Sequence, residues 1–228
     1  MSDFDPINSS SLFRNGYVYL PQYKSTYAPD DVMSLLGSSP DTYKENSNLH
    51  NAYLEEHNIL LSLGTALCNA SKNNLGVKVD IDDVYKITRV VYATDLNESY
   101  LTHFDSHIFT LVTPLIMPPR LESNNGELII FNKIRKEPGN ELSNMASKLF
   151  YKKNNGKQKV EYLMQHTSYI EVNFSDMVPV LFLGRQSLHC NRPFSSNAPY
   201  PRVTLLTHFF DPSPLFSVGN LNRFIRNR

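Results

Sequence analysis

The amino-acid sequence predicts a mainly β protein of the sandwich or jelly-roll class, with helices placed before the strands. Two observations support this prediction. Short runs rich in β-branched and aromatic residues follow one another from residue 77 onward, and turn-forming residues separate them. Apolar residues make up 41% of the 228-residue chain, with 13 Tyr and 13 Phe, which is enough for one substantial core. We therefore expect a single domain over residues 1–228.

The first part of the chain is expected to contain most of the helices. Residues 1–12 are polar and are expected to be disordered, and residues 13–20 form a short β-like run after a turn. A Pro-Asp-Asp start followed by a glycine stop predicts a helix over residues 29–36. Residues 38–48 are loop-like. Apolar side chains at three- and four-residue steps predict the longest helix over residues 51–72.

The expected strands share short length and either alternating or continuous apolar side chains. They are residues 84–93, 108–116, 127–131, 160–164, 168–174, 178–183 and 202–210. The stretch 132–159 interrupts this series with basic and polar residues and one predicted helix over residues 142–151. We expect this stretch to be an insertion, either a solvated face or a lid over an anionic substrate.

Composition and charge exclude several classes of protein. The 22 basic and 22 acidic side chains give a formal net charge of zero, which argues against nucleic-acid and charged-membrane partners. Cys68 and Cys190 are too few for a disulfide framework or a four-cysteine zinc site. The sequence contains neither a signal-peptide pattern nor a run of 18 apolar residues. We therefore expect a cytoplasmic protein, and the sequence gives no indication of its oligomeric state.

Three residues have the types and order of a metal site. His103 and Asp105 are two residues apart, so that on an extended segment both side chains point to the same side. His189 follows shortly after an apolar strand. Two histidines and one carboxylate form the facial triad of non-haem Fe(II) oxygenases, which leaves three adjacent coordination positions open. A bidentate 2-oxo acid can take two of these positions and dioxygen the third.

Arg202 supplies a complementary anchor. It begins the last apolar strand as Arg202-Val203-Thr204. A guanidinium can hold a carboxylate with two parallel hydrogen bonds, whereas a lysine offers only a point charge. Thr204 would face the same way and could donate a third hydrogen bond. A dicarboxylate such as 2-oxoglutarate could therefore bind between the metal and this strand.

This ordered set of motifs resembles the Fe(II)/2-oxoglutarate-dependent dioxygenase superfamily. The family pattern of H-x-D, a distant His and then R-x-S/T reads here as HFD at 103–105, His189 and RVT at 202–204. Thr110-Leu111 is similar to the strand that follows the H-x-D motif in the family, and Gly126-Glu127-Leu128 is similar to its G-G-E-L step. The resemblance touches most of the chain, in scattered motifs.

The resemblance implies a double-stranded β-helix (jelly roll, cupin-like) and a reaction that consumes 2-oxoglutarate and O2 and forms succinate and CO2. It implies that His103, Asp105 and His189 bind Fe(II), and that Arg202 and Thr204 hold the distal carboxylate of 2-oxoglutarate. Because relatives that halogenate lack the carboxylate, Asp105 favours hydroxylation. The expected substrate is a small molecule such as an amino acid or derivative.

Two other functions remain open at this point. A cupin-like isomerase or a sugar-binding jelly roll would use a similar fold without 2-oxoglutarate, and a non-catalytic protein could keep the fold for protein interaction.

Three arginines are candidates for contacts with an anionic substrate: Arg89, Arg120 and Arg185. Arg89 lies in the middle of an expected strand, where it faces either the interior or the solvent. His107 is either a second group near the metal or a packing residue, and His208 is expected to be a hydrogen-bonded core histidine.

Overall fold

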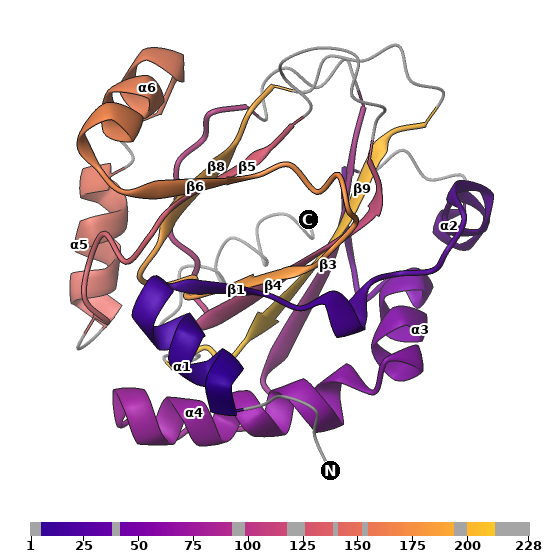
Figure 1. Cartoon of the computed structure of the whole chain (residues 1–228), viewed down its shortest axis with the longest axis horizontal. Coiled ribbons are helices and arrows are strands. Elements are labelled where there is room, and N and C mark those ends of the chain that lie inside the picture. Colours follow the sequence, from indigo (N-terminus) through magenta and orange to yellow (C-terminus); the bar gives the residue numbers. More distant parts are fainter. Residues whose placement is uncertain are drawn as a thin grey trace.

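Two antiparallel β-sheets provide the framework of the protein (Figure 1). The computed structural model describes residues 6–37, 42–92, 99–117, 126–138, 141–151, 155–193 and 200–212. The predicted class, mainly β with N-terminal helices, is confirmed. Among the described residues, none of the helices is long and apolar enough to cross a membrane.

The larger sheet has six strands in the order β1-β7-β4-β9-β3-β2. Their bounds are β1 (Tyr17–Tyr19), β7 (Val180–Phe182), β4 (Phe109–Ile116), β9 (Arg202–Phe209), β3 (Val84–Val91) and β2 (Tyr43–Glu45). β9 lies between β4 and β3 and pairs with most of the length of both. The smaller sheet consists of β6 (Tyr169–Val172), β5 (Leu128–Phe131) and β8 (Leu188–Asn191), in that order.

The N-terminal helices cover the outer face of the larger sheet (Figure 1). They are α1 (Pro6–Asn15), the short 3-10 helix η1 (Pro21–Tyr23), α2 (Pro29–Leu36), α3 (Asn48–Glu56), the π-helical turn η2 (Leu60–Gly64) and α4 (Thr65–Leu75). Leu63 and Leu67 belong to the same buried apolar cluster as Leu205 and Phe209 of β9. Because successive side chains of a strand alternate between faces, Leu206 and His208 of β9 point to the other side.

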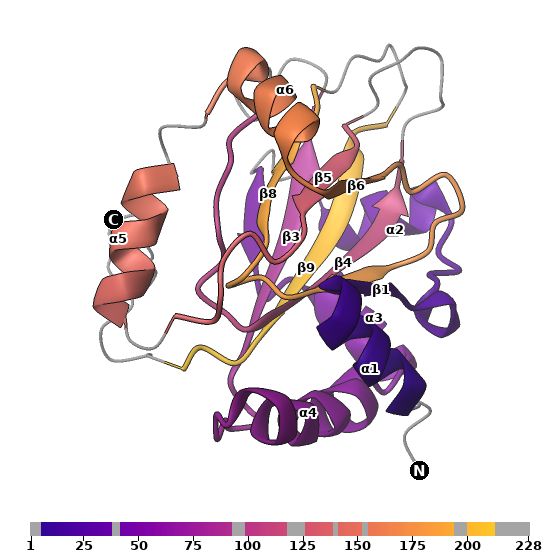
Figure 2. The same ribbon diagram turned by 60° about the vertical axis from the view of Figure 1, so that its left-hand side comes forward.

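The stretch predicted as an insertion forms two helices beside the smaller sheet (Figure 2). These are α5 (Glu141–Tyr151), as predicted, and α6 (Lys157–His166). Val160 packs in a second apolar cluster with Ile129 and Phe131 of β5. Tyr151 of α5 meets the ring of Phe104 edge-on, with 5.2 Å between ring centroids. The helices therefore contact both the smaller sheet and the segment that carries His103 and Asp105.

Four details differ from the sequence-based expectations. Residues 6–12, expected to be disordered, and residues 13–15, expected to be β-like, belong to α1, while residues 1–5 lie outside the described residues. The helix expected over 51–72 is interrupted after Glu56, where Asn58 has a φ of 49° that an α-helix does not allow. The strand expected at 160–164 is part of α6, in which Val160 is the buried residue. Two short strands, β2 and β8, were not expected.

Candidate metal centre

A cavity of about 680 Å³ lies between the two sheets. Residues from β2, β3, β4, β7 and β9 line one side, and residues from β5 and β8 line the other. On β9, the side chains that reach the cavity are alternate residues: Arg202, Thr204, Leu206 and His208. The same strand therefore presents the predicted anchor and a histidine to one cavity.

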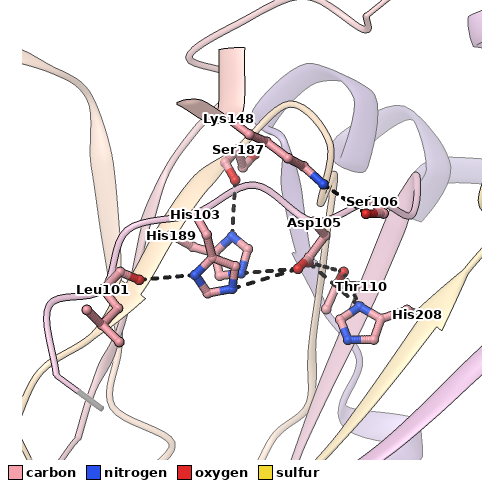
Figure 3. Close-up of polar contacts among 9 residues, drawn as sticks. All are labelled: Leu101, His103, Asp105, Ser106, Thr110, Lys148, Ser187, His189 and His208. Atoms are coloured by element: carbon pink, nitrogen blue, oxygen red, sulfur yellow. Dashed lines mark hydrogen bonds and ion pairs between the residues drawn. The ribbon is translucent and has the colours of Figure 1, made fainter. Parts of the chain in front are cut away.

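The structure brings together the three predicted metal ligands at this cavity (Figure 3). One ligand atom from each of His103, Asp105 and His189 lies within 4.8 Å of the others. His103 Nε2 is 3.9 Å and His189 Nε2 is 3.6 Å from Asp105 Oδ1. The two histidines are joined through their backbones, because each N–H donates to the carbonyl of the other at 3.0 Å.

Hydrogen bonds to the backbone set the orientation of both imidazoles (Figure 3). His103 Nδ1 lies 3.0 Å from the Leu101 carbonyl oxygen, and His189 Nδ1 lies 3.1 Å from the Ser187 carbonyl oxygen. A carbonyl oxygen can only accept, so each Nδ1 carries a proton, and in the neutral ring Nε2 would present a lone pair to a metal. Desolvation and the neighbouring His189 lower the pKa of His103 to about 4, so its ring is neutral at pH 7.

The carboxylate of Asp105 is fixed by its second oxygen. Thr110 Oγ1 donates to Asp105 Oδ2 at 2.5 Å, and His208 Nδ1 lies 3.0 Å from Thr110 Oγ1 and 3.7 Å from Asp105 Oδ2. Burial alone would raise the pKa of Asp105, but His189, His208, His103 and Thr110 together lower it below its ordinary value. The group is therefore ionised, with Oδ1 directed at the imidazoles and Oδ2 held from behind.

This donor set fits a divalent transition metal. Two nitrogen lone pairs and one carboxylate oxygen converge from one side, which is the ligand type and number of a facial site. The outer contacts to Leu101, Ser187 and Thr110 hold each ligand in its metal-binding orientation. The side chain of His103 is 59% exposed, whereas those of Asp105 and His189 are 9% and 8% exposed.

Gly184 lies directly against Asp105 and Thr110. A Cβ atom at this position would lie 2.7 Å from Thr110 Oγ1 and 2.8 Å from Asp105 Oδ2. The Gly184 carbonyl also accepts from the backbone N–H of Asp105 at 3.0 Å. The absence of a side chain at residue 184 therefore leaves the space that the carboxylate occupies. In the sequence, the only sign of this packing role is that a glycine stands in the turn before His189.

Arg202 and Thr204 lie at another part of the same cavity. The side chain of Arg202 is 3% exposed, and its Nη2 donates to Asn191 Oδ1 at 3.3 Å. Its buried Nε has no hydrogen-bond partner among the described residues. Desolvation and the nearby Arg89 lower the pKa of Arg202 to about 9, so the guanidinium is still protonated at neutral pH. A buried cation with an unsatisfied donor fits an anionic ligand.

The backbone makes room for this arginine. Gly126 has a φ of 71°, and a Cβ atom there would lie 2.9 Å from Arg202 Nη1. The guanidinium of Arg202 thus crosses from the larger sheet to the start of β5.

The other predicted contact residues lie in different places. Arg89 lines the cavity from β3, directly opposite Thr204 on β9. Arg185 does not line it. Its Nε lies 2.7 Å from Glu137 Oε1 and its Nη1 donates to the Ser106 carbonyl at 3.2 Å. This placement gives Arg185 a supporting role behind the segment that carries Asp105. Arg120 lies outside the described residues.

His107, which the sequence offered as either a second group near the metal or a packing residue, reaches the cavity, and so does Lys148, which the sequence pattern did not place there. His107 is 4% exposed and stacks on Tyr85. Lys148 of α5 donates from Nζ to Ser106 Oγ at 2.8 Å (Figure 3). α5 therefore contributes one side chain to the cavity, beside the segment that carries the metal ligands.

Comparison with known proteins identifies the fold. No family profile and no curated protein matches the sequence. A prolyl 4-hydroxylase structure from Phytophthora capsici is 12% identical over 98% of this chain and 70% of its own, with a TM-score of 0.53. The epimerase SnoN from nogalamycin biosynthesis, in complex with Fe3+ and alpha ketoglutarate, is 11% identical over 92% and 89%, with a TM-score of 0.52. A prolyl hydroxylase from Trichoplax adhaerens is 12% identical over 92% and 90%, with a TM-score of 0.50.

Proposed function

Starting from a chain that has the fold of Fe(II)- and 2-oxoglutarate-dependent oxygenases, we propose that this protein is itself such an oxygenase. The proposed reaction hydroxylates a C–H bond of a small molecule, such as an amino acid or derivative, and forms succinate and CO2. The observation that carries the proposal is the pairing of two sites in one cavity. A three-ligand centre of His103, Asp105 and His189 shares that cavity with the buried guanidinium of Arg202.

Each of these residues has a defined task in the proposed reaction. His103 Nε2, His189 Nε2 and Asp105 Oδ1 would hold Fe(II), and Arg202 with Thr204 would hold the distal carboxylate of 2-oxoglutarate. When bound, iron and 2-oxoglutarate would activate O2, which is the oxidant both for the C–H bond and for the decarboxylation of 2-oxoglutarate to succinate. The protein supplies two imidazole nitrogens, an ionised carboxylate and a buried cation.

A metal-binding isomerase or a sugar-binding jelly roll without 2-oxoglutarate accounts for the triad less completely. Neither function needs a buried guanidinium with an unsatisfied Nε in the metal cavity. Asp105 also supports hydroxylation over halogenation, because the carboxylate takes the position that a halide would need.

The proposal is tested by binding and by product formation. Titration calorimetry under anaerobic conditions is expected to show binding of 2-oxoglutarate to the Fe(II)-loaded protein. Arg202→Ala should weaken that binding while metal affinity is unchanged, and Asp105→Ala should weaken metal binding. On admission of air, succinate should form in the presence of a substrate from a broad small-molecule panel. The proposal would be contradicted if Arg202→Ala bound 2-oxoglutarate as tightly as the wild type, or if no compound of the panel led to succinate.

A further inference from the structure

Besides the metal ligands and Arg202, side chains from β2 and β3, at the edge of the larger sheet, also line the cavity. Alternate residues of these two strands line the cavity: Tyr43 and Glu45 from β2, and Tyr85, Ile87 and Arg89 from β3. The register places Tyr43 opposite Arg89 and Glu45 opposite Ile87. We call this set of five residues the edge wall. None of them is needed to hold the metal or the proposed co-substrate.

Arg89 and Glu45 are diagonal neighbours on the edge wall. Because Glu45 is two residues from the direct partner of Arg89, the two positions lie about 7–8 Å apart. Both side chains reach the same cavity, one as a cation and one as an anion. Two opposite charges at this spacing can bind the two charged groups of a small zwitterion. The guanidinium of Arg89 would bind its carboxylate, and the carboxylate of Glu45 would bind its ammonium group.

Both charged groups are held in place by the edge wall itself. The Arg89 guanidinium lies over the ring of Tyr43, 5.8 Å from its centroid. The hydroxyl of Tyr85 donates to Glu45 Oε1. Arg89 therefore lies toward β2, whereas Arg202 reaches the other way, to Asn191 on β8 and Gly126 beside β5. The two guanidiniums are neighbours in the cavity, but these contacts lie on opposite sides.

The end of the edge wall near the metal centre is aromatic. The rings of Tyr85 and His107 are nearly parallel at 8°, with centroids 5.8 Å apart, and His208 stacks with both at 6.0 and 5.2 Å. His208 in turn contacts Thr110 beside Asp105. Glu45 lies opposite Ile87, and Tyr85 is two residues from Ile87 along β3, which corresponds to about 7 Å. The side chain of an amino acid can span this distance.

We propose that the edge wall binds the head group of a free α-amino acid. Arg89 takes the carboxylate, Glu45 takes the ammonium group, and the side chain extends past Ile87 toward the metal centre. This inference rests on the proposed oxygenase function and names its substrate class.

The test measures amino-acid binding to the protein loaded with Fe(II) and 2-oxoglutarate under anaerobic conditions. The probes are the free proteinogenic amino acids and, for those that bind, the N-acetyl and carboxamide derivatives. At least one free amino acid should bind, and each derivative should bind at least about tenfold more weakly, because one charge-assisted contact is lost.

Two variants assign the contacts. Arg89→Met should weaken the free amino acid about 10- to 100-fold and leave the already weak carboxamide unchanged. Glu45→Gln should also weaken binding of the free amino acid about 10- to 100-fold and leave binding of the N-acetyl derivative unchanged. Lys44→Met is the matched control, because Lys44 lies between Tyr43 and Glu45 but donates to the Leu36 carbonyl instead. Arg89→Lys, which keeps the charge without the paired donors, should show an intermediate loss.

Retained 2-oxoglutarate affinity in these variants shows that they are folded and that the proposed anchor is separate. If the protein binds 2-oxoglutarate but none of the free amino acids, this inference is overturned and the oxygenase proposal stays intact. Loss of 2-oxoglutarate affinity in both Arg89 variants would also overturn it, because Arg89 would then belong to the co-substrate anchor. Equal binding of capped and free amino acids would equally overturn it.

Discussion

Substitution of Gly184 by alanine is expected to disable the metal centre without touching a ligand. The added Cβ would lie 2.7 Å from Thr110 Oγ1, 2.8 Å from Asp105 Oδ2 and 3.0 Å from Asp105 Cβ. Ordinary contacts begin near 3.4 Å, so Thr110 and the carboxylate are too close by about 0.7 and 0.6 Å. Metal ligands must be held within about 0.5 Å of their productive geometry, so this displacement is large enough to matter.

The displacement cannot be absorbed by free rotation. Asp105 Oδ2 is held by Thr110, and the backbone of Asp105 is hydrogen-bonded to Gly184 itself. We expect metal affinity to fall by roughly 10- to 100-fold, as for loss of an outer contact to a ligand. Overpacking should also lower the free energy of unfolding by about 1–3 kcal/mol.

The assay is titration of the metal-free protein with Mn(II) or Fe(II) under anaerobic conditions, with urea unfolding in parallel. Gly64→Ala is the matched control, since its Cβ would meet nothing closer than 3.6 Å and its φ is negative. The control should keep wild-type metal affinity, with stability unchanged or raised by up to about 1 kcal/mol. If Gly184→Ala binds the metal as tightly as the wild type, the placement of Asp105 as a ligand is refuted.

Three further substitutions test other parts of the structure. Thr110→Val keeps the shape but removes the hydrogen bond to Asp105, so Mn(II) affinity measured by calorimetry should fall about tenfold or more; unchanged affinity would show that the bond has no role. Arg202→Lys should weaken 2-oxoglutarate binding by at least about tenfold with unchanged metal affinity, because lysine cannot form two parallel bonds; equal affinity would argue against a two-bond anchor. Desolvation lowers the pKa of His50 to about 3, so the unfolded chain binds one more proton between pH 3 and 6.5. The contribution of His50 to stability should therefore fall by up to roughly 5 kcal/mol as pH drops through this window, and His50→Gln should make the dependence in urea unfolding shallower, leaving the part due to other groups such as His103; the same slope in both proteins would refute this assignment.

The strands with strong patterns could be predicted from the sequence. Residues 84–91, 109–116 and 202–209 are long and rich in β-branched or apolar side chains, and they form the three longest strands among the described residues. The three residues of β2 carry no such pattern, because an edge strand this short depends on pairing with β3. Residues 160–164 show the opposite problem: the apolar residues fit a strand over five positions, and the helical period is visible only over residues 157–166.

The candidate site was predictable in its chemistry and not in its surroundings. His103, Asp105, His189 and Arg202 could be selected because a facial iron site with an arginine anchor needs these residue types in this order, whereas strand packing does not. The role of Gly184 depends on a distance between two loops, which no local pattern encodes. Whether Arg89 faced the cavity depended on its register opposite Thr204, since a one-residue shift would have turned it to the other face.

The position of β9 has a consequence for biosynthesis. β9 is the last strand in chain order among those described, yet it fills the middle of the larger sheet between β3 and β4. Until residues 202–209 leave the ribosome, β3 and β4 expose unpaired edges, and Arg202, Thr204 and His208 are missing from the cavity. Such non-local pairing is slow to form. Metal loading is therefore expected to follow translation of β9, and the nascent chain before that point is the species most exposed to aggregation.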